Sequence, residues 1–217
     1  MVRTRIRTIS SAKWTAALLV PAALVVGAWT YATGQLTIAP ETRLWIEGTS
    51  TVRSFKCEAT QVQGSVGFQG ELGTALADLG TAVDAVELSI PVAALDCKNG
   101  TMNNHMRKAL KATDNPVIGY RMTSREVTPG ADGALTVNLT GLLTIAGAEK
   151  EITMTAQAAQ DSTGLYVVTG SHALKMTEWG VKPPSLMLGT MRVRDSVTVR
   201  YEIVLARDTG QASTAQQ

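Results

Sequence analysis

The stretch LTVNLTGLLTI, residues 135–145, alternates between two kinds of side chain. Every odd position is apolar or glycine, whereas the even positions are mostly small or polar, with Leu142 as the exception. Successive side chains of a β-strand point to opposite faces of the sheet. The stretch therefore predicts a strand with one buried face and one solvated face.

The same alternation extends over most of the chain. The final stretch, residues 192–205, places these apolar side chains on one face: Val193, Val197, Val199, Tyr201, Ile203 and Leu205. Weaker versions cover residues 43–58, 61–70, 82–92, 117–124, 149–159 and 165–175. Eight strands joined mostly by short links favour antiparallel neighbours. Such an all-β set can close into a barrel, which removes its edge strands, or divide into two stacked sheets.

One segment has the period of a helix. Residues 101–112 place Met102, Met106, Ala109 and Leu110 on one face and polar or charged residues on the other. Thr101 is a suitable N-cap, and a helix could not continue through Pro116. We expect a short amphipathic helix between the third and fourth strands.

The N-terminus has the pattern of a secretory signal. Arg3, Arg5, Arg7 and Lys13 precede an uncharged run over residues 14–29, and small residues follow at Ala32 and Gly34. We expect a signal peptide over residues 1–34 that is cleaved before Gln35, and a periplasmic or secreted protein. The alternative is an uncleaved membrane anchor that holds the domain outside the cytoplasm. The barrel domain is then residues 35–206, followed by a disordered tail over residues 207–217.

Charge argues against nucleic acid as a partner. Removing the four basic residues of the signal leaves 16 of the 20 basic residues against 18 acidic ones. The exported domain therefore lacks the positive charge with which proteins bind nucleic-acid backbones. The oligomeric state is not decided by the sequence, and a homodimer is one option.

Export would place the two cysteines, Cys57 and Cys97, in an oxidising compartment. A lone pair of cysteines in an oxidising compartment usually forms a disulfide. Closing a loop of this length stabilises the fold by about 4 kcal/mol in the chain-entropy description. A metal site is the weaker interpretation, because two cysteines and the distant His105 and His172 do not have zinc-finger spacing. We expect no bound metal and no cofactor.

Several motifs together resemble the YceI-like family of exported proteins. In chain order they read TRLWIEGTSTVRSFKCEA, ELSIPVAALDC, MNNHMRKALKATDNPVIGY, GLLTIAGAEKEITM and MTEWGVKPPSLMLGTMRVRDSVTVRYEI. The resemblance spans Thr42 to Ala206 and implies an eight-stranded antiparallel barrel of lipocalin-like architecture that holds a polyisoprenoid chain. Two positions depart from the family pattern. Arg53 stands where many relatives have histidine, and Glu149 replaces the usual threonine before Lys150.

The expected function is therefore binding of an apolar isoprenoid lipid, a quinone or a prenyl lipid, in the barrel lumen. Removing apolar surface from water contributes about 25 cal/mol per Å². The candidate contact residues, in the lumen and its lid, are Met102, Met106, Leu110, Leu139, Leu143, Trp179, Leu186, Met187, Leu188, Val197, Val199 and Tyr201. The methionine stripe is also what a helix needs simply to pack.

The irregular segment WGVKPPSLMLGTM, residues 179–191, joins the last two strands and is rich in apolar side chains. We expect it to fold across or into one barrel end, as a plug of the core or as a lid on the ligand.

Two other classes of function compete with lipid binding. A barrel with a filled core would be a ligand-free stress-related or surface interaction protein. An enzyme is less favoured, because neither histidine sits in a recognisable catalytic motif, and each is expected to be a surface or packing residue.

Overall fold

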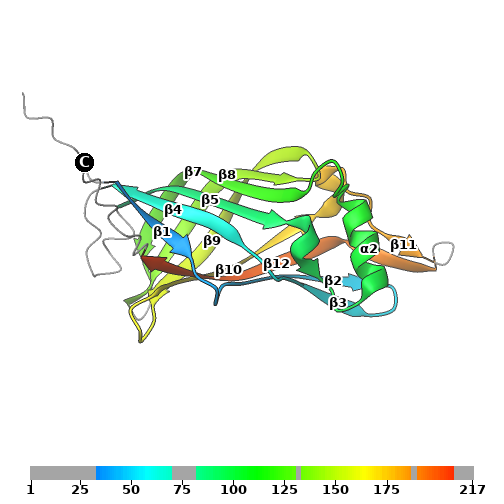
Figure 1. Cartoon of the computed structure of the whole chain (residues 1–217), viewed down its shortest axis with the longest axis horizontal. Coiled ribbons are helices and arrows are strands. Elements are labelled where there is room, and N and C mark those ends of the chain that lie inside the picture. Colours follow the sequence, from blue (N-terminus) through cyan, green and yellow to red (C-terminus); the bar gives the residue numbers. More distant parts are fainter. Residues whose placement is uncertain (1–32, 70–81, 131–132, 187–189, 208–217) are drawn as a thin grey trace, which may run out of the picture. The chain divides into compact units, whose positions relative to one another are not determined.

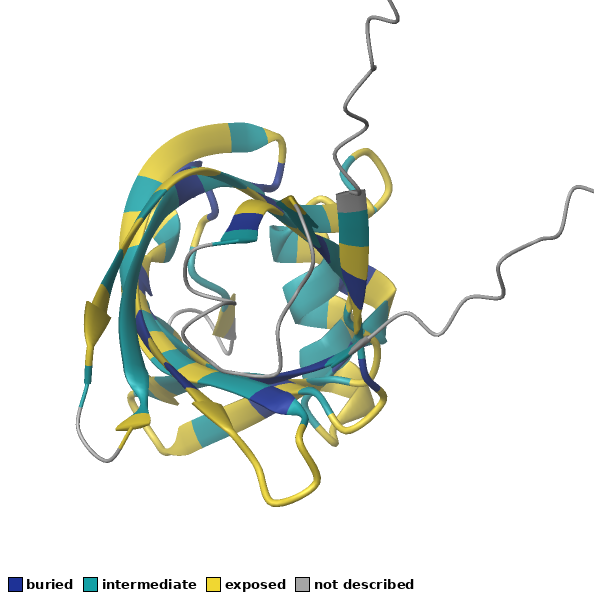
Figure 2. Ribbon diagram, turned by 90° about the vertical axis from the view of Figure 1, so that its left-hand side faces the viewer, coloured by how far each residue is buried: buried dark blue, intermediate teal, exposed yellow. Residues whose placement is uncertain are grey.

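Hydrogen bonds between the first and last strands close the sheet into a ring. The computed structural model describes residues 33–69, 82–130, 133–186 and 190–207, which lie within one compact unit, Tyr31–Gln217. Figure 1 shows the strands from the side, and Figure 2 looks along the barrel, where they surround the lumen. The expected closed eight-stranded antiparallel barrel is confirmed.

The barrel strands follow one another around the ring in chain order. β1 and β2 act as one barrel strand, as do β3 and β4, because each half pairs with the matching half of its neighbours. The strands are β1 (Thr33–Ile38), β2 (Arg43–Ser50), β3 (Ser54–Ala59), β4 (Gln63–Gln69), β5 (Val83–Pro91), β7 (Val117–Pro129), β8 (Leu135–Ile145), β9 (Ala148–Gln160), β10 (Tyr166–Lys175) and β12 (Met191–Arg207).

The short elements gather at one end of the barrel. They are η1 (Val92–Ala94), β6 (Leu95–Asp96), α2 (Gly100–Ala109), η3 (Met176–Trp179) and β11 (Ser185–Leu186). Figure 1 shows α2 and β11 at the end where the β2–β3 hairpin turns. No helix in the described part of the chain is long and apolar enough to cross a membrane.

β12 closes the ring by pairing with both halves of the first barrel strand. Leu36 of β1 pairs with Arg207, and Leu44 of β2 pairs with Tyr201. On its other side β12 pairs with β10 over ten residue pairs, from Tyr166 to Lys175. Closure leaves no long open edge on the barrel strands, so no exposed row of unpaired backbone groups invites another chain.

The predicted count of eight strands is correct, but the first predicted strand is wrong, whereas the second, residues 61–70, is found as β4. Residues 43–58, expected as one strand, fold into the β2–β3 hairpin with a turn at residues 51–53. The turn contains no glycine, proline or asparagine. Instead the Ser50 hydroxyl donates to the Arg53 carbonyl at 2.9 Å and accepts from the Arg53 amide at 3.1 Å. β1, which was not predicted, forms the first barrel strand together with β2.

The outer boundaries of the barrel also differ from the sequence expectation. Thr33 and Gly34, assigned to the signal peptide, belong to β1, and Arg207, assigned to the tail, ends β12. The rest of the predicted signal, residues 1–32, and the rest of the predicted tail, residues 208–217, lie outside the described residues.

α2 starts one residue earlier than predicted and has a different cap. The Asn99 side chain accepts a hydrogen bond from the Met102 amide at 2.9 Å, so Asn99 rather than Thr101 is the N-cap. The helix ends at Ala109, before Pro116 could stop it, because Lys111 has a left-handed φ of 51°.

The missed strand β1 carries one of the most deeply buried side chains. Leu36 is fully buried and packs with Val66, Tyr166, Ile203 and Leu205 near the end of the barrel opposite α2. Its strand, β1, pairs with β4 on one side and with β12 on the other. The apolar contact of Leu36 therefore joins the first strand to the last.

We expect Leu36→Ala to lower the free energy of unfolding by about 2 to 5 kcal/mol, because it leaves a cavity at the closure. The measurement is urea denaturation followed by far-UV circular dichroism. Thr37→Ala is the matched control, since Thr37 is exposed on the opposite face of the same strand. Equal losses in the two variants would contradict the assigned role of Leu36.

Candidate ligand-binding cavity

A cavity of about 520 Å³ lies inside the barrel. Its wall is formed by inward-facing side chains of every barrel strand, by one face of α2 and by η3. Most of these side chains are apolar, because the inward positions of each strand alternate with the solvated ones. Small-molecule sites in proteins typically have volumes of about 300–1,000 Å³. The cavity is thus large enough for a ligand.

Nine of the twelve residues predicted to contact a ligand line this cavity. They are Met102, Met106, Leu110, Leu139, Leu143, Trp179, Val197, Val199 and Tyr201. The side chain of Leu186 and the whole of Met187 and Leu188 lie outside the described residues. The apolar faces read from the alternation of residues 135–145 and 192–205 therefore point into the lumen.

The segment that follows β10 packs into the end of the barrel beside α2. Trp179 and Val181 are each only 3% exposed and pack against Ile145, Leu174 and Val197. This agrees with the expectation that residues 179–191 fold across or into one barrel end, as far as the segment is described.

Backbone and side-chain hydrogen bonds fix this segment in place. The Trp179 indole Nε1 donates to the Leu143 carbonyl at 3.3 Å. Asp195 accepts from the Thr177 amide at 2.9 Å and from its hydroxyl at 2.7 Å, and these bonds hold the pKa of Asp195 below its ordinary value. Gly180 ends η3 at a φ of 67°, a conformation that favours glycine.

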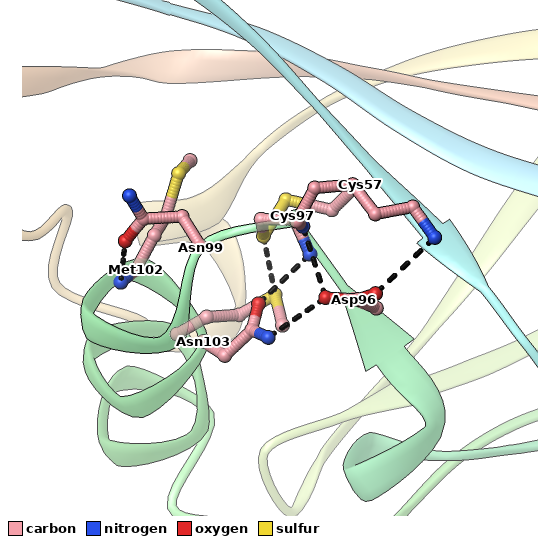
Figure 3. Close-up of a disulfide and its surroundings, with 8 residues drawn as sticks. Cys57, Asp96, Cys97, Asn99, Met102 and Asn103 are labelled. Carbon is pink, nitrogen blue, oxygen red and sulfur yellow. Dashed lines mark hydrogen bonds and ion pairs between the residues drawn. A yellow bond between two sulfur atoms is a disulfide. The ribbon is translucent and has the colours of Figure 1, made fainter.

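A disulfide ties α2 to the barrel wall (Figure 3). The predicted bond between Cys57 of β3 and Cys97, just before α2, is confirmed. The Asn103 side chain adds a second link, because it accepts from the Cys97 amide at 2.8 Å and donates to Asp96 at 2.8 Å. The N-terminal turns of α2 are therefore held covalently and by hydrogen bonds.

The Asp96 carboxylate binds several groups in the segment that leads into α2. Its carboxylate accepts from the Asn103 side chain and from the Lys98 amide, and it pairs with the Lys98 ammonium at 3.3 Å. These interactions, the Asn103 bond first, hold the pKa of Asp96 below its ordinary value. Lys98 reaches this position with a left-handed φ of 54°.

The sequence interpretation did not predict the polar atoms that two tyrosines bring to the cavity wall. Tyr120 was not predicted as a site residue, and Tyr201 was predicted only as apolar surface. Both line the cavity, and neither hydroxyl has a hydrogen-bond partner among the described residues. Burial, and second the nearby Tyr201 phenol, raises the pKa of Tyr120 to about 12, while burial alone raises the pKa of Tyr201.

Each of these tyrosine rings occupies the space of an absent side chain. Tyr201 lies directly opposite Gly170 on the neighbouring strand, and a Cβ at Gly170 would overlap the Tyr201 ring. A Cβ at Gly141 would come within 2.7 Å of the Tyr120 ring. The two glycines allow the rings to lie close to the barrel wall, which leaves more of the lumen open.

Charged and titratable groups also reach the cavity. His105 and His172, expected as surface or packing residues, both line it. Burial lowers the pKa of His172, so its imidazole is neutral at neutral pH. Arg125 lines the cavity because β7 contains a bulge between Met122 and Ser124. Within the described ranges, no group of three His, Cys, Asp or Glu residues could hold a metal ion.

We expect the double variant Cys57→Ala/Cys97→Ala to lose about 4 kcal/mol of unfolding free energy, because the disulfide closes a loop in the unfolded chain. The two cysteines are 40 residues apart. Urea denaturation at neutral pH measures the loss. A reductant should bring the wild type down to the level of the variant and leave the variant unchanged. A variant as stable as the oxidised wild type would refute the expectation.

A second expectation concerns alkaline pH. The pKa of Tyr120 is about 12 in the folded protein and 10.0 ordinarily, so the unfolded chain loses this proton first as the pH rises. The corresponding stabilisation is present below pH 10 and is lost as the pH approaches 12. The unfolding free energy of Tyr120→Phe should therefore fall less steeply over this range than that of the wild type. Parallel curves in urea denaturation would rule the effect out.

Solved structures with the same fold include proteins from three bacteria. BcnA of Burkholderia cenocepacia superposes with a TM-score of 0.59 at 17% identity, over 75% of this chain and 95% of that one. A polyisoprenoid-binding domain from Saccharophagus degradans, implicated in plant cell wall breakdown, gives 0.60 at 11% identity, over 81% and 99%. The YceI protein of Campylobacter jejuni gives 0.53 at 19% identity, over 71% and 85%. At these identities the likeness concerns the fold.

No curated protein matched the chain significantly. The family model of the YceI-like domain matches residues 44–205, which run from β2 to near the end of β12 and so include nearly every residue that lines the cavity. The motifs of the sequence had suggested the same family. The chain belongs to the YceI-like family.

Proposed function

We propose that this protein binds a polyisoprenoid lipid, a quinone or a prenyl lipid, inside its barrel. The observation that carries the proposal is the cavity itself, about 520 Å³ enclosed by apolar side chains from all sides of the ring. A long apolar chain is the class of ligand that such a wall stabilises, since apolar surface needs no polar partner.

The free energy available is sufficient for a chain of several isoprene units. Burial contributes about 0.8 kcal/mol per CH₂-sized group, or roughly 4 kcal/mol for a five-carbon unit. Association itself costs about 4 to 15 kcal/mol in lost translational and rotational freedom. A single unit therefore binds weakly, whereas several units in one lumen exceed the cost. This comparison favours a polyisoprenoid over a small terpene.

The structural neighbour from Saccharophagus degradans supports this class of ligand, because it is described as a polyisoprenoid-binding domain. Its barrel and the present one align over most of both chains. We extend the class of ligand, and not its identity, to this protein.

We propose that residues at the α2 end of the barrel contact the bound lipid. Met102, Met106 and Leu110 of α2 face the cavity, and methionine adapts to irregular apolar shapes. Trp179 is packed within the protein and also lines the cavity, so it acts as part of the wall at this end. The alternative of a filled core does not agree with the open cavity.

Export from the cytoplasm is the second part of the proposal. The basic N-terminus and the uncharged run over residues 14–29 support it, and the disulfide suits an oxidising compartment. Cleavage before Gln35 would remove Thr33 and Gly34 from β1 but keep the pairs that Leu36, Thr37 and Ile38 make with β12. The barrel would remain closed after processing.

Native mass spectrometry of the protein purified from the exported fraction tests both parts. We expect a mass that corresponds to a chain starting at Gln35, less two hydrogens for the disulfide, and a bound lipid that collisional activation releases. Protein without any lipid that also fails to bind an added polyprenyl quinone would contradict the lipid-binding proposal. An uncleaved mass in the membrane fraction would instead favour the anchor.

A pair of variants on one strand makes this measurement specific to the lumen. Val168 lines the cavity, and the next residue, Thr169, is exposed on the outer face of β10. Val168→Trp should fill the lumen and reduce the lipid-bound fraction several-fold, while Thr169→Trp should retain lipid as the wild type does. Val168→Phe replaces Val168→Trp if circular dichroism shows that the tryptophan variant is unfolded.

A further inference from the structure

Both of the large apolar side chains that are exposed in the described part of the chain lie at the α2 end of the barrel. Val52, in the turn of the β2–β3 hairpin, is 65% exposed, and Val117, the first residue of β7, is 42% exposed. A single exposed valine is common on a protein surface. The position of both at one end distinguishes this end from the rest of the barrel surface.

Hydrogen bonds attach the turn that carries Val52 to the neighbouring strand. The Thr51 amide donates to the Arg192 carbonyl at 2.9 Å, and the Thr51 hydroxyl donates to the Thr190 carbonyl at 3.1 Å. The Val52 amide donates to the Ser50 hydroxyl at 3.3 Å. The backbone of the turn is therefore held on two sides, while the Val52 side chain faces solvent.

Positive charge gathers at the same end of the barrel. The α2 end, taken as residues 50–54, 91–117, 145–151, 175–186 and 190–196, carries ten basic and six acidic side chains, a net charge of +4. The remaining described residues carry six basic and eight acidic side chains, a net charge of −2. The basic side chains of the α2 end are Arg53, Lys98, Arg107, Lys108, Lys111, Lys150, Lys175, Lys182, Arg192 and Arg194. The acidic ones are Asp96, Asp114, Glu149, Glu151, Glu178 and Asp195.

The outer face of α2 contributes lysines to this surface. α2 lies across the end of the barrel (Figure 1), and Met102 and Met106 line the cavity. Lys108 follows Met106 by two positions, which is more than half a turn around the helix axis, so it faces away from the lumen. Lys111 follows just beyond the helix. Both lysines are exposed, and within the described ranges neither forms a salt bridge.

The lumen reaches the surface beside these groups. Arg53, Asn99 and Thr101 line the cavity and are also exposed to solvent. Arg53 belongs to the turn of the β2–β3 hairpin, whereas Asn99 and Thr101 lie at the N-terminal end of α2. The cavity is therefore accessible between the hairpin and α2, next to the exposed Val52.

We propose that the α2 end of the barrel binds the surface of a bilayer that contains anionic lipids. Val52 enters the boundary between head groups and acyl chains, and the surrounding basic side chains, including Lys108 and Lys111, contact lipid phosphates. Charges on several separate elements suit mobile head groups, which can rearrange under each of them. The choice of a membrane over an acidic protein rests on the proposed lipid-binding function, because an isoprenoid lipid resides in a bilayer and would enter the cavity at this end.

A tryptophan placed at each end of the barrel tests the orientation on the membrane. Val52→Trp puts an indole at the proposed contact, and Ser162→Trp puts one in the exposed turn between β9 and β10, at the opposite end. The protein, as recovered from the exported fraction, is mixed with vesicles of phosphatidylglycerol and chain-brominated phosphatidylcholine. Relative to the wild type, we expect the added emission of Val52→Trp to be quenched and shifted to shorter wavelength. The added emission of Ser162→Trp should not change.

Neutralising two lysines of α2 tests the contribution of charge. A basic residue near an anionic membrane strengthens binding by about 5-fold, so Lys108→Gln/Lys111→Gln should bind these vesicles roughly 25-fold more weakly in a sedimentation assay. Lys56→Gln/Arg121→Gln is the matched control, since it removes the same charge from exposed side chains on the outer wall of the barrel. This control should stay within about 2-fold of the wild type, because distant charges are screened by salt.

Three results would overturn the proposal. Quenching of Ser162→Trp in place of Val52→Trp would put the opposite end on the membrane, where β1 begins. Equally strong binding of the wild type to vesicles of phosphatidylcholine alone would remove the role of anionic lipid. Equal binding by the lysine variant and its control would show that α2 does not contact the membrane, and an acidic protein would then be the partner that the charge fits.

The lipid-binding function fails in a different measurement. If the tryptophan and lysine variants behave as expected but native mass spectrometry finds no bound lipid, the membrane-binding surface stands and the lumen is not a lipid site. If lipid is bound but the wild type does not sediment with anionic vesicles, the surface is overturned and lipid binding stands.

Discussion

The pairing of β12 with the first barrel strand is the interaction on which the structure depends. It turns a meander of strands into a ring, and only a ring gives every strand an inside and an outside. Because alternate side chains point to opposite faces of each strand, the apolar ones then line a common lumen. Leu36 and Leu44 hold the closure at two levels, since each pairs with β12 and is buried. The cavity and its apolar wall follow from this one pairing.

An enclosed lumen would normally be filled by its own side chains. Here small residues prevent this at defined places, as where Gly170 and Gly141 receive the rings of Tyr201 and Tyr120. The two tyrosine rings therefore lie along the barrel wall and do not extend across the lumen. At the end of the barrel beside α2, the lumen is lined by Trp179 and by α2, which the disulfide fixes to β3. Open space in the lumen and the wall at this end are thus provided by different residues.

Sequence reasoning succeeded where local pattern and tertiary structure agree. Residues 135–145 form a strand with the predicted bounds, because every odd position there is apolar or glycine. Sequence reasoning failed where a single residue creates a turn or shifts the inward positions of a strand. The turn after Ser50 is made by a serine side chain and lacks the usual turn residues, so β2 and β3 were read as one strand. In β7 the bulge after Met122 moves the inward positions from even to odd numbers, which hid both the length of the strand and the inward Arg125.

The site was predictable to the extent that it is a face of a strand or helix. Val197, Val199 and Tyr201 were found from their spacing, and the methionines of α2 from theirs. Tyr120 was not found, although it lines the cavity on the same strand face as Ile118. His172 lies on the same inward face of β10 as Tyr166 and Leu174, so the alternation of that strand could have placed it in the cavity.

Closure has one more consequence, for the connectivity of the chain. Leu36 and Arg207 are direct partners, so the first and last strands end side by side at the rim away from α2. A short peptide could join them there, and the chain could be opened instead at an exposed turn such as residues 161–164. The order of the strands in the chain would change while every strand pair was kept. For this barrel the circular order of strands, rather than the position of the termini, defines the fold.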